Sequence, residues 1–203
     1  MNPIRRLLLG TNNPGKIAEM TALLDGFSLV ILKPSDLCLD LQVEETGVSY
    51  LENAVLKALS WSSQCGITTL ADDSGLEVDA LNGAPGVMSH RFTGNSGSSD
   101  AERRKHLLHQ LQNAPRPWTA RFQCAVAIAI PGEELITGAG SCEGEIIPEE
   151  RGTNGFGYDP IFLVRGTGKT MAELSPDQKN QLSHRARAMA STRPILIERL
   201  LKD

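Results

Sequence analysis

The stretch that decides the fold runs from Leu7 to Lys16 and reads LLLGTNNPGK. Its three leucines form a short apolar run that ends at Gly10, which is typical of a buried strand. After the polar turn, apolar residues recur at helical spacing between Lys16 and Leu24. A second apolar run, Leu29 to Leu32, predicts another strand. The order strand, loop, helix, strand is the unit that builds α/β sheets, so we expect an α/β fold.

The same stretch is one residue short of a phosphate-binding P-loop. The spacing G-x-x-x-x-G-K is complete from Gly10 to Lys16, but Ile17 stands where Ser or Thr would hold a magnesium ion. Backbone N–H groups at the start of a helix still favour an anion, and Lys16 suits a point charge aimed at phosphate. If the chain handles a nucleoside triphosphate, acidic residues elsewhere must therefore hold the metal.

Length and composition are those of an ordinary globular protein. The 203 residues are enough for one core, and we expect a single domain over residues 1–203. A formal net charge of -4 argues against general nucleic-acid binding, which needs a basic face. No run of about 18 apolar residues predicts a membrane span. The cysteines are scattered without a C-x-x-C pair, which favours free, buried thiols in a reducing cytoplasm over disulfides or a zinc site; they are Cys38, Cys65, Cys124 and Cys142.

The pattern of apolar and turn-forming residues predicts the remaining elements. We expect a loop or lid in the segment 82–99, which is rich in Gly, Pro, Ser and Asn. The tail 183–201 is expected to be helical with an interruption at Pro194. Further helices are predicted at 49–61 and 100–111, and strands at 67–71, in a long hairpin over 119–147, and at 160–164.

Two acidic pairs are candidates for the metal site. Asp72 and Asp73 directly follow the strand predicted at 67–71, and since neighbours on a strand face opposite sides, we expect only one of them to face a ligand. The end of a buried strand is where open α/β sheets place ligands, although Asp-Ser-Gly is equally good turn chemistry. Glu44-Glu45 would more commonly be a capping or surface pair. One Glu and one Asp would nevertheless supply the oxygen ligands that magnesium prefers.

A second glycine-rich loop, Gly155-Phe156-Gly157-Tyr158-Asp159, places two aromatic residues between glycines in a chain that is only 4% aromatic. An aromatic side chain on a loop can stack on a purine while Asp159 binds its polar edge. Anchoring of the next strand explains the aromatic residues equally well. Ser183-His184-Arg185 could donate hydrogen bonds to a base or phosphate, or could simply begin the last helix.

Taken together, these motifs resemble the inosine triphosphatase family, the pyrophosphatases of non-standard purine nucleoside triphosphates. The matching pieces stand in order and cover nearly the whole chain. They are Thr11–Lys16, Glu44–Gly47, Glu52–Ala54 with Lys57, Ala71–Leu76, Gly83–Gly86, Arg91, Gly155–Pro160 and Ser183–Arg185. In the first of them, Asn12 stands where the family commonly has glycine.

The resemblance implies a long central mixed β-sheet flanked by helices, with two lobes around a nucleotide cleft, in a cytoplasmic homodimer. It implies magnesium-dependent cleavage of ITP, dITP and XTP between the α- and β-phosphates. By matched position, Asp73 would be the base and would bind Mg²⁺ together with Glu44. The implied substrate contacts are Thr11, Asn12, Asn13, Pro14, Gly15 and Lys16 for the triphosphate, together with Ser74, Phe156, Gly157, Tyr158, Asp159, Lys179, His184 and Arg185.

Two other functions remain open on sequence alone. The first is a P-loop-like ATPase or GTPase whose metal-binding strand would be residues 67–73; Ile17 counts against it, and the loop at 155–159 has no role there. The second is a non-catalytic purine nucleotide sensor, although a sensor needs no carboxylate that activates water. We expect neither nucleic acid nor a membrane among the partners of this chain.

Overall fold

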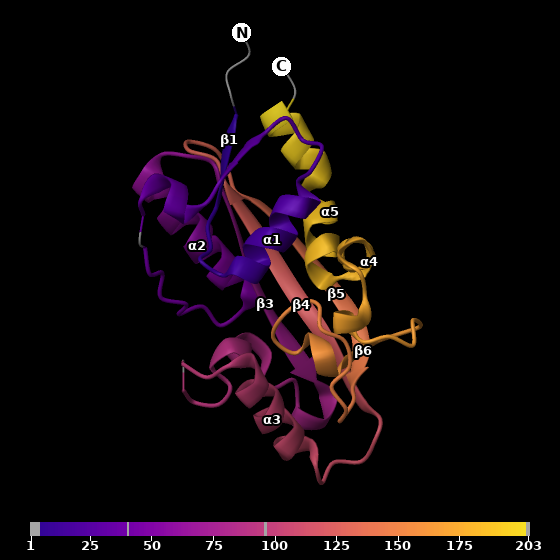
Figure 1. Cartoon of the computed structure of the whole chain (residues 1–203). Helices are drawn as coiled ribbons and strands as arrows, with labels where there is room; N and C mark the ends of the chain where they lie inside the picture. The colour runs from indigo at the N-terminus through magenta and orange to yellow at the C-terminus, as the bar shows by residue number, and fades with distance from the viewer. Residues whose placement is uncertain (1–4, 40, 96, 202–203) are drawn as a thin grey trace. The chain divides into compact units, whose positions relative to one another are not determined.

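The computed structural model of the chain describes residues 5–39, 41–95 and 97–201. Six strands form one sheet in the order β2-β1-β3-β4-β5-β6 (Figure 1). Strand β1 (Arg6–Leu9) pairs in parallel with β2 (Val30–Leu32) and with β3 (Thr69–Val78). Strand β4 (Trp118–Ala129) is followed by β5 (Ile136–Ile146), which pairs antiparallel with β6 (Phe162–Val164). The predicted α/β fold with a mixed sheet flanked by helices is confirmed.

The chain divides into two compact units, in agreement with the expectation of two lobes. The first consists of Met1–Asp73, Cys124–Gly140 and Arg185–Asp203, and the second of Ser74–Gln123 and Ser141–His184. The single domain over residues 1–203 stays a prediction. Among the described residues, no helix combines the length and the apolar character that crossing a membrane requires.

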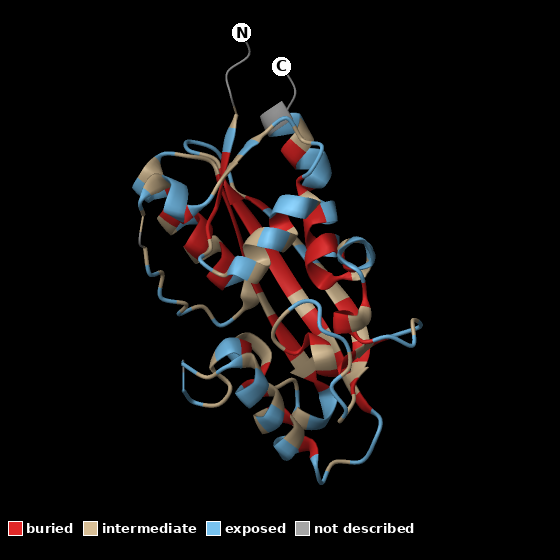
Figure 2. Ribbon diagram, viewed as in Figure 1, coloured by how far each residue is buried: buried red, intermediate tan, exposed pale blue. Residues whose placement is uncertain are grey.

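The first unit is built around the leucines of β1, which are fully buried (Figure 2). Helix α1 (Pro14–Leu23) begins where the side chain of Asn13 accepts the N–H of Lys16. Helix α2 (Tyr50–Cys65) begins at a Ser49 cap and ends at Gly66, whose φ of 67° suits glycine. Its alanines pack on alanines of β3 and β4, which lets the helix approach the sheet closely. The unit also contains the 3-10 turn Pro34–Leu37 and the π-helical segment Ile197–Leu201.

The second unit has its own apolar core, formed by the inner leucines of α3 (Asp100–Leu111) and residues of β3 to β6. A capping box between Ser99 and Glu102 fixes the start of α3. Helix α4 (Pro176–Leu182) starts at a second box, between Ser175 and Gln178. Four 3-10 turns complete this unit: Asp79–Leu81, Gly86–Arg91, Asp159–Ile161 and Met171–Glu173.

Three predictions about elements were wrong. Strand β3 does not end before Asp72 but continues to Val78, because its later residues Leu76 and Val78 are buried in the apolar core of the second unit. Helix α5 (His184–Leu196) continues through Pro194, which lies near its end and removes only one backbone donor. The short strand predicted at 160–164 begins only at Phe162, after a 3-10 turn.

Candidate functional site

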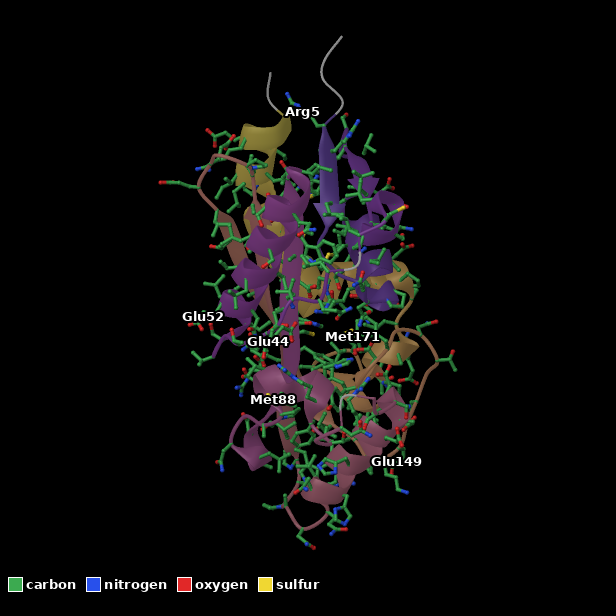
Figure 3. All side chains as sticks on the ribbon, turned by 90° about the vertical axis from the view of Figure 1, so that its left-hand side faces the viewer. Arg5, Glu44, Glu52, Met88, Glu149 and Met171 are labelled. Carbon is green, nitrogen blue, oxygen red and sulfur yellow. The ribbon has the colours of Figure 1, made fainter. Side chains whose placement is uncertain are left out.

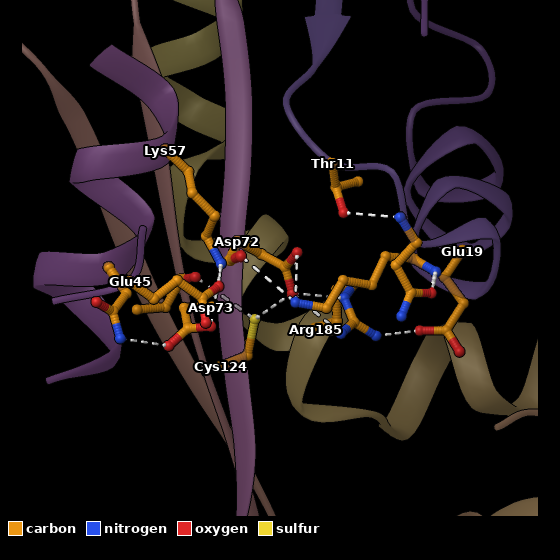
Figure 4. Close-up of polar contacts among 12 residues, drawn as sticks. Thr11, Glu19, Glu45, Lys57, Asp72, Asp73, Cys124 and Arg185 are labelled. Atoms are coloured by element: carbon orange, nitrogen blue, oxygen red, sulfur yellow. Dashed lines mark hydrogen bonds and ion pairs between the residues drawn. The ribbon is translucent and has the colours of Figure 1, made fainter. Parts of the chain in front are cut away.

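Asp73 lies within β3 and is held by two side chains of α2 (Figure 4). Asn53 Nδ2 donates to Asp73 Oδ2 at 3.2 Å, and Lys57 Nζ lies 3.1 Å from Asp73 Oδ1. Lys57 also donates to Glu45 Oε1 at 2.6 Å. Burial raises the pKa of Asp73, and the nearby Lys57 and Lys16 only partly offset that effect. The Asp73 carboxylate is therefore held in place by two partners, and it accepts a proton more readily than a solvent-exposed carboxylate does.

Lys57 keeps its charge in this environment. Burial works against the ammonium, but the carboxylates of Asp73, Asp72 and Glu45 outweigh it, so the pKa of Lys57 is raised. Asn53 and Lys57 are four residues apart on α2, and helical spacing therefore places both on the face toward Asp73. Neither was among the predicted site residues, although that spacing could have indicated them.

Asp72 makes an entirely different set of contacts. Its Oδ2 accepts from Arg185 Nε at 3.1 Å and from Nη2 at 3.0 Å. Lys16 Nζ lies 3.2 Å from Asp72 Oδ1, and Arg185 also pairs with Glu19 of α1. Burial alone would raise the pKa of Asp72, but Lys16, Arg185 and Lys57 together lower it well below its usual value. Asp72 therefore stays ionised at neutral pH and pairs with two cations. The expectation that neighbouring aspartates face apart is confirmed.

The loop that leads into α1 is fixed by its own side chains. Thr11 Oγ1 accepts the N–H of Asn13 at 3.2 Å, and Asn13 Oδ1 accepts the N–H of Lys16 at 3.1 Å. At Gly10 an added Cβ would lie 2.9 Å from the Trp61 side chain, so close packing requires glycine there. Asn12 is exposed, and among the described non-glycine residues only Cys38 and Asn82 have positive φ. Its backbone therefore does not need a glycine.

In the second unit, the predicted aromatic loop folds around a buried ion pair. Asp159 Oδ2 accepts the N–H of Phe156 at 2.9 Å and pairs with Lys179. Gly155 has a φ of +77°, and a Cβ on it would lie 2.0 Å from Asp159 Oδ2. Lys179 Nζ lies 5.1 Å from the centroid of the Phe156 ring, a cation–π distance.

The two aromatic residues of this loop differ in role. Tyr158 is buried, and its hydroxyl donates to the carbonyl oxygen of Ser89 at 2.9 Å. Burial raises its pKa to about 12. Phe156 is only half-buried. Of the two rings, Phe156 is the one with a surface left for a ligand.

The motif Ser183-His184-Arg185 lies where α4 ends and α5 begins. His184 stacks on Phe122 in the second unit, with ring centroids 4.8 Å apart and planes at 17°. Arg185 belongs to the first unit and binds Asp72. The motif therefore contributes residues to both units.

The remaining predicted residues are less constrained. The side chain of Glu44, labelled in Figure 3, is exposed, whereas Glu45 beside it is half-buried and bonds Lys57. Ser74 follows Asp73 in β3 and is half-buried. Ile17, the residue that breaks the P-loop pattern, packs against the core of the first unit. The assigned roles of all these residues stay predictions.

The sequence model of the Ham1 family matches residues 7–195. The chain belongs to the Ham1 family. Its sequence is 44% identical over 194 residues to a dITP/XTP pyrophosphatase of Bacillus licheniformis, covering 95% of this chain and 98% of that protein. It is 45% identical over 186 residues to a dITP/XTP pyrophosphatase of Geobacter sulfurreducens, covering 91% and 93%. The motif-based resemblance to pyrophosphatases of non-standard purine nucleotides is thereby confirmed.

Solved structures of the Ham1 family agree with this assignment. A HAM1 protein from Coxiella burnetii matches with a TM-score of 0.85 at 38% identity, covering 96% of this chain and 100% of that one. The Ham1 protein of Staphylococcus aureus matches with a TM-score of 0.83 at 39% identity, covering 96% and 99%. Likeness of sequence and of fold thus extends over almost the entire chain.

The donor chemistry of this Ham1 site suits a hard divalent cation. Asp73 offers carboxylate oxygens, the ligand type that magnesium prefers. Within residues 5–39, 41–95 and 97–201, no group of three or more His, Cys, Asp or Glu side chains could hold a metal ion. A metal here would therefore take further ligands from substrate phosphates and water, which is how magnesium is usually bound.

Proposed function

We propose that this chain hydrolyses the non-standard purine nucleotides ITP, dITP and XTP between the α- and β-phosphates. The products are the nucleoside monophosphate and pyrophosphate, and the reaction clears these nucleotides from the pool. The observation that carries the proposal is the near full-length similarity to dITP/XTP pyrophosphatases, which covers 95% of this chain and 98% of the Bacillus licheniformis protein. The enzyme would work as a homodimer in the cytoplasm.

Asp73 is the general base in this proposal. Its pKa is raised by burial, which favours uptake of a proton from the attacking water. Asn53 and Lys57 hold its two oxygens at 3.2 and 3.1 Å, so the carboxylate is positioned before substrate binds. Glu44 and Asp73 would hold Mg²⁺. When bound, that ion would draw charge from the phosphates and lower the pKa of a bound water.

The triphosphate would contact Thr11 to Lys16. Backbone N–H groups at the start of α1 and the Lys16 ammonium would stabilise the charge that develops on the pyrophosphate leaving group. The Lys16 ammonium lies 3.2 Å from the Asp72 carboxylate, and this ion pair fixes the position of the ammonium before a nucleotide binds. Positioning of this kind is the main contribution a protein makes to phosphoryl chemistry.

The purine would contact the second loop and its neighbours. Phe156 would stack on the ring, and donors would bind the 6-oxo group. The 6-amino group of adenine would leave those donors unpaired, and mismatches of this kind can discriminate by about 10⁴. The proposed contacts are Ser74, Phe156, Gly157, Tyr158, Asp159, Lys179, His184 and Arg185.

A panel of nucleotides tests the proposal. ITP, dITP, XTP, GTP and ATP are incubated with the enzyme, with and without Mg²⁺, and pyrophosphate and orthophosphate are measured separately. We expect IMP and pyrophosphate in equal amounts from ITP, only with the metal. Release of IDP and orthophosphate would point instead to a P-loop-like ATPase or GTPase, and tight ITP binding without turnover to a sensor.

A further inference from the structure

Helix α3 holds both backbone polar groups of Gly157. Asp100 Oδ2 accepts the N–H of Gly157 at 2.7 Å, and Arg104 Nη1 donates to its carbonyl oxygen at 2.9 Å. Asp100 and Arg104 are four residues apart, so one face of α3 presents both side chains. A loop glycine would ordinarily bond water with these groups. Here it is held from both sides by charged side chains, which form the stronger class of hydrogen bond.

The two side chains are themselves held in place. Arg104 forms a two-pronged bond with Glu150, with Nε and Nη2 each 2.9 Å from a carboxylate oxygen. Asp100 pairs with Arg103, and the Ser99–Glu102 capping box fixes the turn on which it stands. The contacts to Gly157 therefore come from a rigid element.

Gly157 is the middle of the loop that carries the proposed base contacts. It has a φ of 63°, a conformation that glycine adopts readily. On one side Phe156 is tied through its N–H to Asp159, and on the other Tyr158 is tied through its hydroxyl to Ser89. Without the bonds from α3, the peptide groups on both sides of Gly157 could rotate and would carry Phe156 with them.

We propose that Asp100 and Arg104 are positioning residues for purine recognition. They fix the segment Phe156–Asp159 in one conformation before a nucleotide binds, so that binding does not have to order the loop and lose conformational entropy. The inference rests on the proposed function of this loop and adds to it two residues of α3 that lie outside the motifs of the family resemblance. Selection among bases, rather than the hydrolysis step, depends on them.

The test uses Arg104→Met and Asp100→Ala in the full chain. Lys105→Met is the matched control, because Lys105 is an exposed cation of the same helix. Hydrogen exchange of peptides that contain residues 155–159 is followed in the free protein. We expect exchange to be about tenfold faster in both variants and unchanged in the control, because each variant removes one of the two bonds that close the loop.

Steady-state kinetics supply the second measurement. We expect the ratio of kcat/KM for ITP to that for ATP to fall by about tenfold through KM, since small misplacements of binding groups have effects of this size. The kcat at saturating ITP should stay within about threefold, because Asp73 and Lys16 are untouched. Equal losses on both nucleotides with an unchanged ratio, or unchanged hydrogen exchange, would overturn the inference.

The two proposals fail in different ways. If the wild-type protein releases no pyrophosphate from ITP, the proposed function is wrong. Hydrogen exchange and the ratio of the Kd values for ITP and ATP then decide the inference by themselves. If Asp100→Ala does not fold, Arg104→Met tests the same loop, because it removes the donor to the Gly157 carbonyl while keeping the apolar stem of the side chain.

Discussion

Asp72 and Asp73 are neighbours in β3, but they face different partners and their pKa values shift in opposite directions. Asp72 lies 3.0 Å from Arg185 Nη2, whereas Asp73 lies 3.1 Å from Lys57 Nζ. The pKa of Asp72 is lowered, because Lys16, Arg185 and Lys57 outweigh the effect of burial. The pKa of Asp73 is raised, because burial outweighs its cations. One aspartate is thus suited to hold cations and the other to accept a proton.

Substituting Asp72 should therefore cost stability. Asp72→Asn keeps the shape of the side chain but removes the negative charge that pairs with the guanidinium of Arg185, which is 1% exposed. Breaking a buried ion pair of this kind costs about 3–5 kcal/mol. Urea unfolding at pH 7 measures the loss, with Asp73→Asn as the neighbouring control. A loss below about 1 kcal/mol would mean that the buried ion pair does not stabilise the fold.

The stabilisation by Asp72 should depend on pH with a definite sign. Its pKa is lower in the folded chain than the ordinary 3.8, so its contribution is complete above pH 3.8 and is lost as the pH falls through the folded value. The difference in unfolding free energy between the wild type and Asp72→Asn should be constant from pH 7 to about pH 5 and shrink below about pH 4. Urea titrations across that range measure it. A difference that grows on acidification would contradict this assignment.

Asp73→Asn should lose activity without losing stability, the opposite of the stability loss expected for Asp72→Asn. Loss of a general base lowers kcat by at least about 10²-fold. The folded pKa of Asp73 lies above 3.8, so ionised Asp73 opposes folding at neutral pH, and Asn removes that effect. We expect pyrophosphate release from ITP to fall while the unfolding free energy is unchanged or higher. A variant that keeps its activity would remove Asp73 from the proposed mechanism.

The sequence predicts those elements around the site whose signals lie close together in the chain. Leu7 to Lys16 reads correctly as strand, loop and helix start because its signals lie within ten residues of one another. Helix α4 was not predicted, since it is short and polar and lacks an apolar periodicity, although its capping box, Ser175 with Gln178, marks its start.

Contacts between distant segments are the parts that could not be predicted. Asp72 and Arg185 are 113 positions apart, and no periodicity links them. By local chemistry the residues Asp72 to Gly75 could equally form a turn. Strand β3 continues through them, because Asp72 and Asp73 find cationic partners on α1, α2 and α5 and the residues that follow are buried in the core of the second unit. The tertiary contacts overrode the local propensity.

The cysteines should react in order of their exposure. The expectation of buried thiols is confirmed for Cys124 and Cys142 but was wrong for Cys38, which is exposed. Cys65 is half-buried, with its Sγ 3.0 Å from the Trp61 carbonyl oxygen. Burial, reinforced by the negative charge of Asp72, raises the pKa of Cys124, so little reactive thiolate forms there. A thiol reagent should label Cys38 fast, Cys65 slowly and the other two only after unfolding. Cys38→Ser should abolish the fast phase alone, and rapid labelling of Cys124 in the folded protein would show that the environment of Asp72 is open to solvent.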